Sequence, residues 1–236
     1  MGVIYTSYAD AFTRPADTTA YTAQDVVGTN LAVTGATNAS PIVITTAAHG
    51  FSTGDVVTIA SVGGNTAANG TFRVTVVSST TFQLDGSTGN GAYTSGGTVA
   101  KWNRIQNASN EGGNGIIRGW KLTTNSTNVT TASFSLAIFK GATTGYQLPP
   151  AATLDNAAIG NNFYTDYRTF VHKTASASIT AATVGTSSGW AEAHNLGIPF
   201  DLDGTSKDLW VQVVAEAGYT PASAQTFRVS LDIEKL

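Results

Sequence analysis

The sequence predicts an all-β protein: a β-sandwich or jelly-roll-like domain that carries an inserted small five-stranded β-barrel. Three observations predict this fold. Apolar and polar residues alternate in short segments, most clearly in Phe227–Ile233. Thr is abundant, and its β-branched side chain suits a pleated sheet. Residues 36–101 repeat a rhythm of short apolar runs and turn clusters, which indicates a separate β unit.

Composition excludes several classes of partner. Only 11% of the 236 residues are charged, and 12 basic against 15 acidic residues give a formal net charge of −3. An ordinary domain carries about 25% charged residues. The electrostatic field of so weakly charged a chain is too weak to hold a nucleic-acid backbone, so we predict no nucleic-acid partner. The apolar runs are too short to cross a bilayer and no segment is polybasic, so we also predict no membrane partner. The chain contains no Cys, which excludes disulfides, thiolate chemistry and Cys-based metal sites.

Residues 36–101 are expected to form the inserted barrel. Five short strands are separated by clusters of Gly, Asn, Ser and Asp, the residues that favour tight turns. The expected strands are Ile42–Thr45, Val56–Ile59, Thr71–Val77, Thr81–Asp85 and Gly97–Ala100. Five strands in about 65 residues suit a small barrel, which avoids exposed sheet edges.

The flanks, residues 1–35 and 102–236, are expected to form one discontinuous sandwich domain. About eight short strands from Ile116 onward, among them Ser133–Phe139 and Leu209–Val213, favour two packed antiparallel sheets. The best helical spacing, in Asn156–Val171, predicts no more than a short turn. Met1–Ala23 has no clear periodicity, so we expect an arm that becomes ordered only on binding its neighbours.

The barrel segment carries a specific pattern. Pro41–Ile59 reads P-I-V-I-T-T-A-A-H-G-F-S-T-G-D-V-V-T-I and is followed by Gly64–Phe72 and Thr81–Gly86. Over Pro41–Val99 the chain resembles a module of tail and other virion proteins of tailed bacteriophages. That module is similar to a small barrel of ubiquitin-activating enzymes, the first catalytic cysteine half-domain. The resemblance implies no ubiquitin chemistry, because no Cys is present to carry a thioester.

Three flanking pieces, Phe12–Tyr21, Leu154–Ala158 and Gly218–Ser223, also resemble phage structural proteins. Together the resemblances imply a non-enzymatic virion protein, most simply a capsid decoration or cement protein made in the bacterial cytoplasm and placed on the phage head. The implied partners are the major capsid protein and sister subunits in a homotrimer, with no cofactor. The alternative is a tail-associated or head-fibre adhesin that binds a host glycan.

Candidate catalytic patterns in the sequence are weak. Gly185–Gly189, with Ser187 at its centre and His194 nearby, matches the G-x-S-x-G nucleophile pattern. That mechanism needs a helix after the serine, and the following segment is too short and Gly-bounded, so a loop is predicted. His49, His172 and His194 lack metal-ligand spacing, and His49 is expected to hydrogen-bond backbone in a turn. We therefore predict no catalytic, cofactor or metal residues.

Acidic residues leave two alternatives open. Asp201, Asp203 and Asp208 surround Gly204 and could hold a hard cation such as Ca²⁺. An Asp-Gly turn between two strands explains the same residues.

A hydrolase would need paired carboxylates, and the glutamates that could supply them are scattered: Glu111, Glu192, Glu216 and Glu234.

Large aromatic residues are expected mainly in the core, because most lie in or beside alternating strands. These are Trp102, Trp120, Trp210, Phe134, Phe139, Phe200 and Phe227. Trp190 is the exception, because Gly189 and polar residues flank it. It is the candidate for contact with a partner or a glycan.

Overall fold

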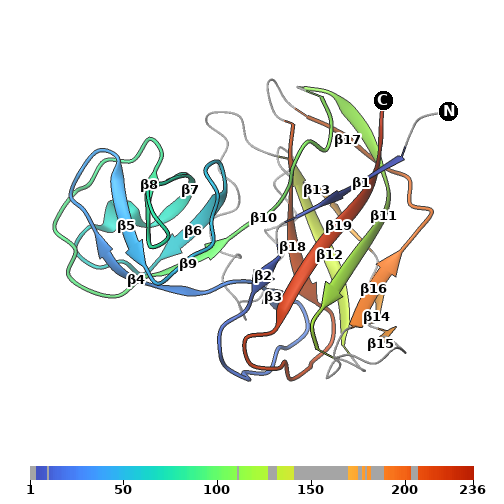
Figure 1. Ribbon diagram of the computed structural model, residues 1–236, viewed down its shortest axis with the longest axis horizontal. Coiled ribbons are helices and arrows are strands. Elements are labelled where there is room, and N and C mark those ends of the chain that lie inside the picture. The colour runs from blue at the N-terminus through green and yellow to red at the C-terminus, as the bar shows by residue number, and fades with distance from the viewer. Residues whose placement is uncertain are drawn as a thin grey trace.

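The computed structural model describes residues 4–9, 11–110, 112–126, 132–140, 170–174, 177–178, 180–181, 189–202 and 207–236. This part of the chain is nearly all β, which confirms the predicted fold class. Its helical content is one 3-10 turn, η1 (Thr66–Ala68). A closed barrel lies beside a two-sheet sandwich, and the first and last described residues, Ile4 and Leu236, both lie at the sandwich (Figure 1). No helix in the described ranges has the length and apolar character needed to cross a membrane.

The barrel has six strands rather than the five that the sequence predicted. They are β4 (Leu31–Ala36), β5 (Ile42–Thr46), β6 (Val56–Ala60), β7 (Gly70–Val76), β8 (Thr81–Leu84) and β9 (Thr98–Lys101). Their order is β4-β5-β8-β7-β6-β9, and β4 closes the ring by pairing with both β5 and β9. The additional strand, β4, begins before residue 36, outside the segment expected to form the barrel.

The turn after β5 shows how the barrel core is closed. The Phe51 N–H donates to His49 Nδ1 (3.0 Å), and His49 Nε2 lies 3.0 Å from the Ser78 carbonyl oxygen. An accepting Nδ1 requires the proton on Nε2, so the ring is a neutral imidazole that donates to Ser78. Its centroid lies 4.7 Å from that of Phe51 and 5.3 Å from that of Phe82. The predicted structural role of His49 is confirmed.

The sandwich consists of two antiparallel sheets. The seven-stranded sheet contains β1 (Ile4–Tyr8), β2 (Phe12–Thr13), β11 (Asn114–Thr124), β15 (Thr180–Ala181), β16 (Gly189–Ala193), β17 (Ile198–Asp201) and β19 (Thr226–Lys235). The six-stranded sheet contains β3 (Val26–Val27), β10 (Asn103–Ile105), β12 (Ser133–Lys140), β13 (Phe170–Lys173), β14 (Ala177–Ser178) and β18 (Leu209–Ala215). Alternate residues of both sheets share one apolar core, which is the arrangement expected of a sandwich.

The aromatic residues predicted for the core are buried. Trp102, Trp120, Trp210, Phe134, Phe139, Phe200 and Phe227 are each no more than 5% exposed. Phe134 meets Tyr219 edge to face at 5.3 Å between ring centroids, and Phe227 at 6.0 Å. Such contacts add to the free energy gained from burying the rings.

A third apolar cluster joins the barrel to the sandwich. It contains Val56 of the barrel, Trp102 of the connection, and Val26, Ala137, Phe139, Trp210 and Val214 of the six-stranded sheet. Trp102 Nε1 donates to Thr58 Oγ1 (3.2 Å), and its ring meets Phe139 edge to face at 5.4 Å. Beside it, Lys101 Nζ lies 2.8 Å from Asp55 Oδ2, with side chains 7% and 0% exposed. Because this cluster covers the second face of β12 and β18, both strands are buried on both faces.

The described part of the N-terminal segment belongs to the sandwich, so the predicted arm was wrong. All five residues of β1 pair with β19, and Ala9, Phe12 and Tyr21 are buried. Arg14 is also buried, and its Nε donates to Tyr21 Oη (2.9 Å). These contacts order the segment within one chain, without a neighbouring subunit.

The predicted helical turn falls mostly outside the described residues. Residues 156–169 lie there, whereas Phe170 and Val171 belong to β13, where the helical expectation was wrong. An aromatic and a β-branched residue suit a strand, and β13 pairs with β12.

Candidate functional site

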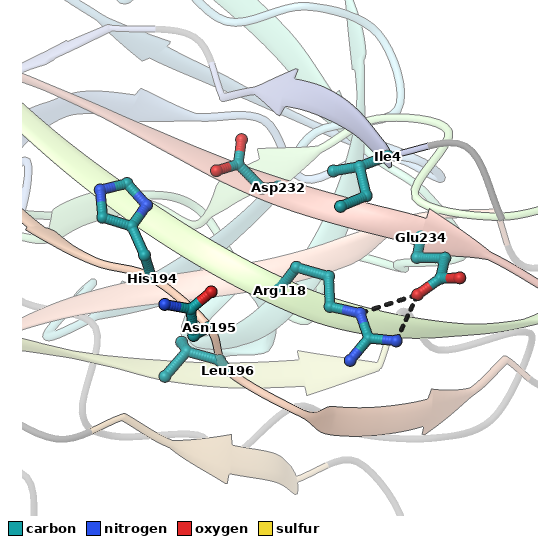
Figure 2. Close-up of a pocket in the computed structure, with 7 residues that line it drawn as sticks. All are labelled: Ile4, Arg118, His194, Asn195, Leu196, Asp232 and Glu234. Carbon is teal, nitrogen blue, oxygen red and sulfur yellow. Dashed lines mark hydrogen bonds and ion pairs between the residues drawn. The ribbon is translucent and has the colours of Figure 1, made fainter. Parts of the chain in front are cut away.

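The outer face of the seven-stranded sheet carries two adjoining cavities, which we call the outer groove. The larger, about 540 Å³, is lined by Ile4, Arg118, His194, Asn195, Leu196, Asp232 and Glu234 (Figure 2). The smaller, about 360 Å³, is lined by Thr6, Tyr8, Lys121, Thr123, Glu192, His194, Arg228, Ser230 and Asp232. His194 and Asp232 belong to both cavities, so the two form one continuous site.

Strand pairing brings distant residues together in this groove. Along β19, Phe227, Val229, Leu231 and Ile233 enter the core, which turns the residues between them outward. One row across four strands is Tyr8, Ser230, Lys121 and Glu192. A second row contains Thr6, Asp232 and Gly119, and a third contains Arg228, Thr123 and Trp190. Side chains of neighbouring strands in such rows are close enough to interact.

A β-bulge at Arg118 shapes the floor of the groove. The register of β11 against β19 shifts between Ile117 and Gly119. As a result Ile117 and Trp120 both enter the core, whereas Arg118 and Gly119 both belong to the groove side. A Cβ at Gly119 would stand 2.9 Å from Asp232 Oδ2 and 3.0 Å from the Ala193 carbonyl oxygen. Glycine therefore leaves the room that the Asp232 carboxylate occupies.

The turn between β16 and β17 supplies His194 and Asn195. Both strands pair with β11, so the turn lies opposite the bulge. Asn195 has a φ of 57°, a left-handed conformation that Asn tolerates well. The Leu196 N–H donates to the Arg118 carbonyl oxygen (2.8 Å), and the Leu196 side chain packs against the core. These contacts hold the turn against the strand.

Three side-chain pairs in the groove join a hydrogen-bond donor to a carboxylate. Arg118 Nε donates to Glu234 Oε2 (2.7 Å), and Arg118 Nη2 contacts the same oxygen (Figure 2). Lys121 Nζ lies 3.1 Å from Glu192 Oε2. Thr6 Oγ1 donates to Asp232 Oδ1 (2.7 Å). Each pair presents a hydrogen-bond donor directly beside an acceptor.

The carboxyl group of Glu192 is held in its charged form. The hydrogen bond from Lys121 is the largest cause that lowers the pKa of Glu192, and His194, 3.6 Å away from Glu192 Oε1, lowers it less. A lowered pKa keeps Glu192 ionised at neutral pH, where a general acid would need a raised one. Glu192 is therefore suited to accepting hydrogen bonds from a ligand rather than to donating a proton.

Two aromatic rings lie on the groove face. Lys121 Nζ is 5.3 Å from the centre of the Trp190 ring, and Arg228 Cζ is 4.8 Å from that of Tyr8. Both distances fit cation–π contacts. Trp190 is half-buried, unlike the three other Trp residues, as the sequence predicted from its flanking residues.

The free side of β1, which we call the β1 edge, is the second surface of interest. Within the described ranges no strand pairs with β1 except β19, so β1 ends the sheet. Ile4, Tyr5 and Tyr8 are 55%, 50% and 55% exposed. No residue of this strand is charged or Pro.

The other candidates from the sequence are placed as follows. Ser187 and Asp203 lie outside the described residues. Asp208 accepts hydrogen bonds from Arg104 Nε (2.7 Å) and the Asn107 N–H (3.0 Å), whereas Asp201 lies 3.5 Å from Lys140 Nζ. The described residues contain no group of three His, Cys, Asp or Glu side chains placed to hold a metal ion.

One comparison with known families gives a match. Residues 40–102 match the family model of the ubiquitin-activating enzyme E1 FCCH domain. The matched segment contains β5 to β9 and confirms the resemblance of the barrel to the small domain of ubiquitin-activating enzymes. No curated protein matches the chain. The match concerns one small domain of an enzyme family, and the outer groove and the β1 edge lie outside it.

Proposed function

We propose that the protein is a non-enzymatic structural protein of a tailed-phage virion that decorates the head by binding the major capsid protein. The observation that carries the proposal is the β1 edge. It offers unpaired backbone donors and acceptors together with three large exposed hydrophobic side chains. The resemblance of the barrel to a module of phage virion proteins supports the same reading.

Proteins that stay monomeric usually protect such an edge. Charged side chains, Pro residues, bulges or a covering loop prevent the addition of another strand. The β1 edge has neither charge nor Pro, in a chain with only 11% charged residues. An extended segment of the capsid protein would add a strand there, with main-chain hydrogen bonds for affinity and contacts to Tyr5 and Tyr8 for selectivity.

The barrel has a different part in this proposal. Its six strands form a closed ring, and Figure 1 shows it extending away from the sandwich. The sandwich would be the base on the shell, and the barrel would project outward. Sister subunits would assemble as a homotrimer around local threefold positions of the shell, because a cyclic arrangement closes all interfaces. Such attachment requires about 1,600 Å² of buried surface per stable contact.

The test uses one substitution in the β1 edge and one matched control. Tyr5→Lys adds a charge at a 50% exposed position of β1, and Val77→Lys adds the same charge at a 58% exposed position after β7 of the barrel. Both chains are added to virion shells that lack the protein, and the bound copies are counted by quantitative mass spectrometry. We expect the wild type and Val77→Lys to bind in hundreds of copies, and Tyr5→Lys to bind about tenfold less, because a charge at a sheet edge opposes strand addition.

Two results would contradict the proposal. If Tyr5→Lys binds as many copies as the wild type, the β1 edge does not attach the protein to the shell. If a dozen or fewer copies bind per virion, the protein belongs to the tail or portal vertex. Salt provides a further check, because attachment through a weakly charged surface survives high ionic strength. In 1 M salt the screening length is about 3 Å, so release of the bound protein there would argue against attachment through the weakly charged β1 edge.

The second candidate is a tail-associated or head-fibre adhesin that binds a host glycan. A specific observation favours it: Tyr8 and paired charges line the outer groove, and Trp190 lies beside Lys121 on the same sheet face. Aromatic rings beside polar groups suit amphipathic ligands.

A further inference from the structure

We propose that the outer groove binds a neutral oligosaccharide through the vicinal hydroxyl groups of its sugar rings. This inference rests on the adhesin candidate, for which it names the ligand class and the residues. It does not require that the protein decorates a head, but Ile4 and Tyr8 of the β1 edge also line the groove. The two roles are therefore tested at Tyr5, which lines neither cavity, and at Asp232, which lies on β19.

The first argument is the arrangement of donors beside acceptors. Two neighbouring hydroxyl groups of a sugar ring each donate one hydrogen bond and accept others. The pairs Arg118–Glu234 and Lys121–Glu192 place an N–H donor and a carboxylate acceptor side by side. A diol can therefore donate to the carboxylate and accept from the cation at the same time. Hydrogen bonds with one charged partner are stronger than those between neutral groups.

The second argument is the position of Asp232 between the two cavities. Thr6 Oγ1 donates to Asp232 Oδ1, which orients the carboxylate. The other oxygen, Oδ2, lies over Gly119, where a side chain would stand only 2.9 Å from it. Because both cavities share Asp232, a chain of sugar rings that follows the groove would pass this carboxylate.

The third argument is the pair of aromatic rings. Sugar rings carry C–H groups on their faces, and these pack well against aromatic side chains. Tyr8 is 55% exposed and lines the smaller cavity, and Trp190 lies beyond Lys121 on the same face of the sheet. Rings fixed by cations lose little conformational freedom when a ligand packs on them.

Charge balance favours a neutral ligand. The cations of the groove are Arg118, Lys121 and Arg228, and the carboxylates are Glu192, Asp232 and Glu234. These charges cancel, so the groove has no excess positive charge to attract a polyanion. Volumes of about 540 and 360 Å³ fall within the range of small-molecule sites, about 300–1,000 Å³.

The test begins with the full chain on a printed array of neutral and acidic bacterial surface oligosaccharides. A neutral oligosaccharide that binds is then titrated calorimetrically against the wild type and three variants. Asp232→Asn and Lys121→Gln change the groove. Lys140→Gln is the matched control, because Lys140 pairs with Asp201 on β12 and β17 and lines neither cavity. Thermal melting confirms that each variant folds.

We expect the two groove variants to weaken binding about tenfold or more, which corresponds to the loss of one charged hydrogen bond. The control should bind within about twofold of the wild type, because surface positions outside a site rarely contribute. The inference is overturned if no neutral oligosaccharide binds, if only acidic ones bind, or if both groove variants bind like the wild type.

Capsid recruitment separates this inference from the decoration proposal. Asp232→Asn should bind shells as the wild type does, and Tyr5→Lys should bind the sugar as the wild type does. If the wild type binds capsid shells but no sugar, the proposal of a sugar site in the outer groove is rejected and the decoration proposal stands. If it binds a sugar but no capsid shell, the decoration proposal is rejected and the sugar site stands.

Discussion

The barrel and the sandwich are both antiparallel β structures, but they differ in what they leave open. The barrel pairs its first strand with its last, β4 with β9, so every strand has two neighbours. The sandwich ends at β1, with three large hydrophobic side chains exposed, and its seven-stranded sheet carries the outer groove. Closure pairs the backbone groups of every barrel strand with a neighbouring strand, whereas the free side of β1 in the sandwich leaves backbone donors and acceptors with which a partner strand could pair.

The junction decides whether these two parts behave as one unit. Trp102 is fully buried between them, donates to Thr58 of the barrel and contacts Phe139 of the sandwich. Trp102→Ala should lower the free energy of unfolding by about 3–5 kcal/mol, the range for truncating a large buried aromatic residue.

The measurement is urea unfolding with Trp fluorescence and backbone circular dichroism as two probes; in Trp102→Ala the remaining Trp residues all lie in the sandwich, on β11, β16 and β18. The wild type should show one transition with both probes, and Trp102→Ala should separate them, because the barrel and the sandwich lose their common cluster. Trp190→Ala is the matched control, followed by circular dichroism. Coincident transitions and a loss below 1.5 kcal/mol in Trp102→Ala would mean that the junction does not couple the two parts.

Buried and exposed ion pairs sharpen the comparison further. Lys101 and Asp55 pair at the junction with side chains 7% and 0% exposed, whereas Lys121 and Glu192 pair on the groove face at 44% and 34%. Lys101→Met should cost about 3 kcal/mol, because it leaves a buried carboxylate without its cation. Lys121→Met should cost about 0.2–1 kcal/mol, because water solvates the remaining carboxylate.

Chemical denaturation of both variants at pH 7 measures this contrast. Equal losses in the two variants would show that burial does not distinguish the pairs. A double variant, Lys101→Met with Asp55→Leu, should recover much of the loss, because no unpaired charge remains.

Local signals made the barrel predictable. Its turns carry Gly, Asn and Asp, and the motif around His49 closes the core beside Phe51 and Phe82. The strand β4 was missed because its pairing with β9 joins residues far apart in the chain, Leu31 with Val99. The same reason explains the mistaken N-terminal arm, since Ile4 pairs with Glu234 at the opposite end of the sequence.

The outer groove was predictable only in part. The exposure of Trp190 followed from its local neighbours, but the rows that unite Tyr8, Lys121 and Glu192 depend on three strand registers. One local signal was available: Arg118 and Gly119 interrupt the alternation between Ile117 and Trp120, as a bulge requires. Their partners Glu234 and Asp232 lie on β19. The alternation predicted that strand, but no local pattern shows that it pairs with β11.

The smallest expected effect concerns the pH dependence of the groove. The hydrogen bond from Lys121 lowers the pKa of Glu192, so the folded state binds its proton less readily than the unfolded state. A lowered carboxyl pKa stabilises the fold above the unfolded pKa, and this stabilisation is lost as the pH falls through the folded pKa. Glu192→Gln should therefore cost about 0.2–1 kcal/mol at pH 7 and nothing once the wild-type carboxyl is protonated.

Carbon-detected NMR titration of Glu192 tests the cause directly. In Lys121→Met the pKa of Glu192 should rise towards its ordinary value, because the largest lowering contact is gone. Lys140→Gln removes a cation from the other sheet and should leave that pKa where it is. A Glu192 pKa that stays low in Lys121→Met would assign the shift to His194, 3.6 Å away, and would separate this carboxylate from the donor–acceptor pair proposed to hold a sugar diol.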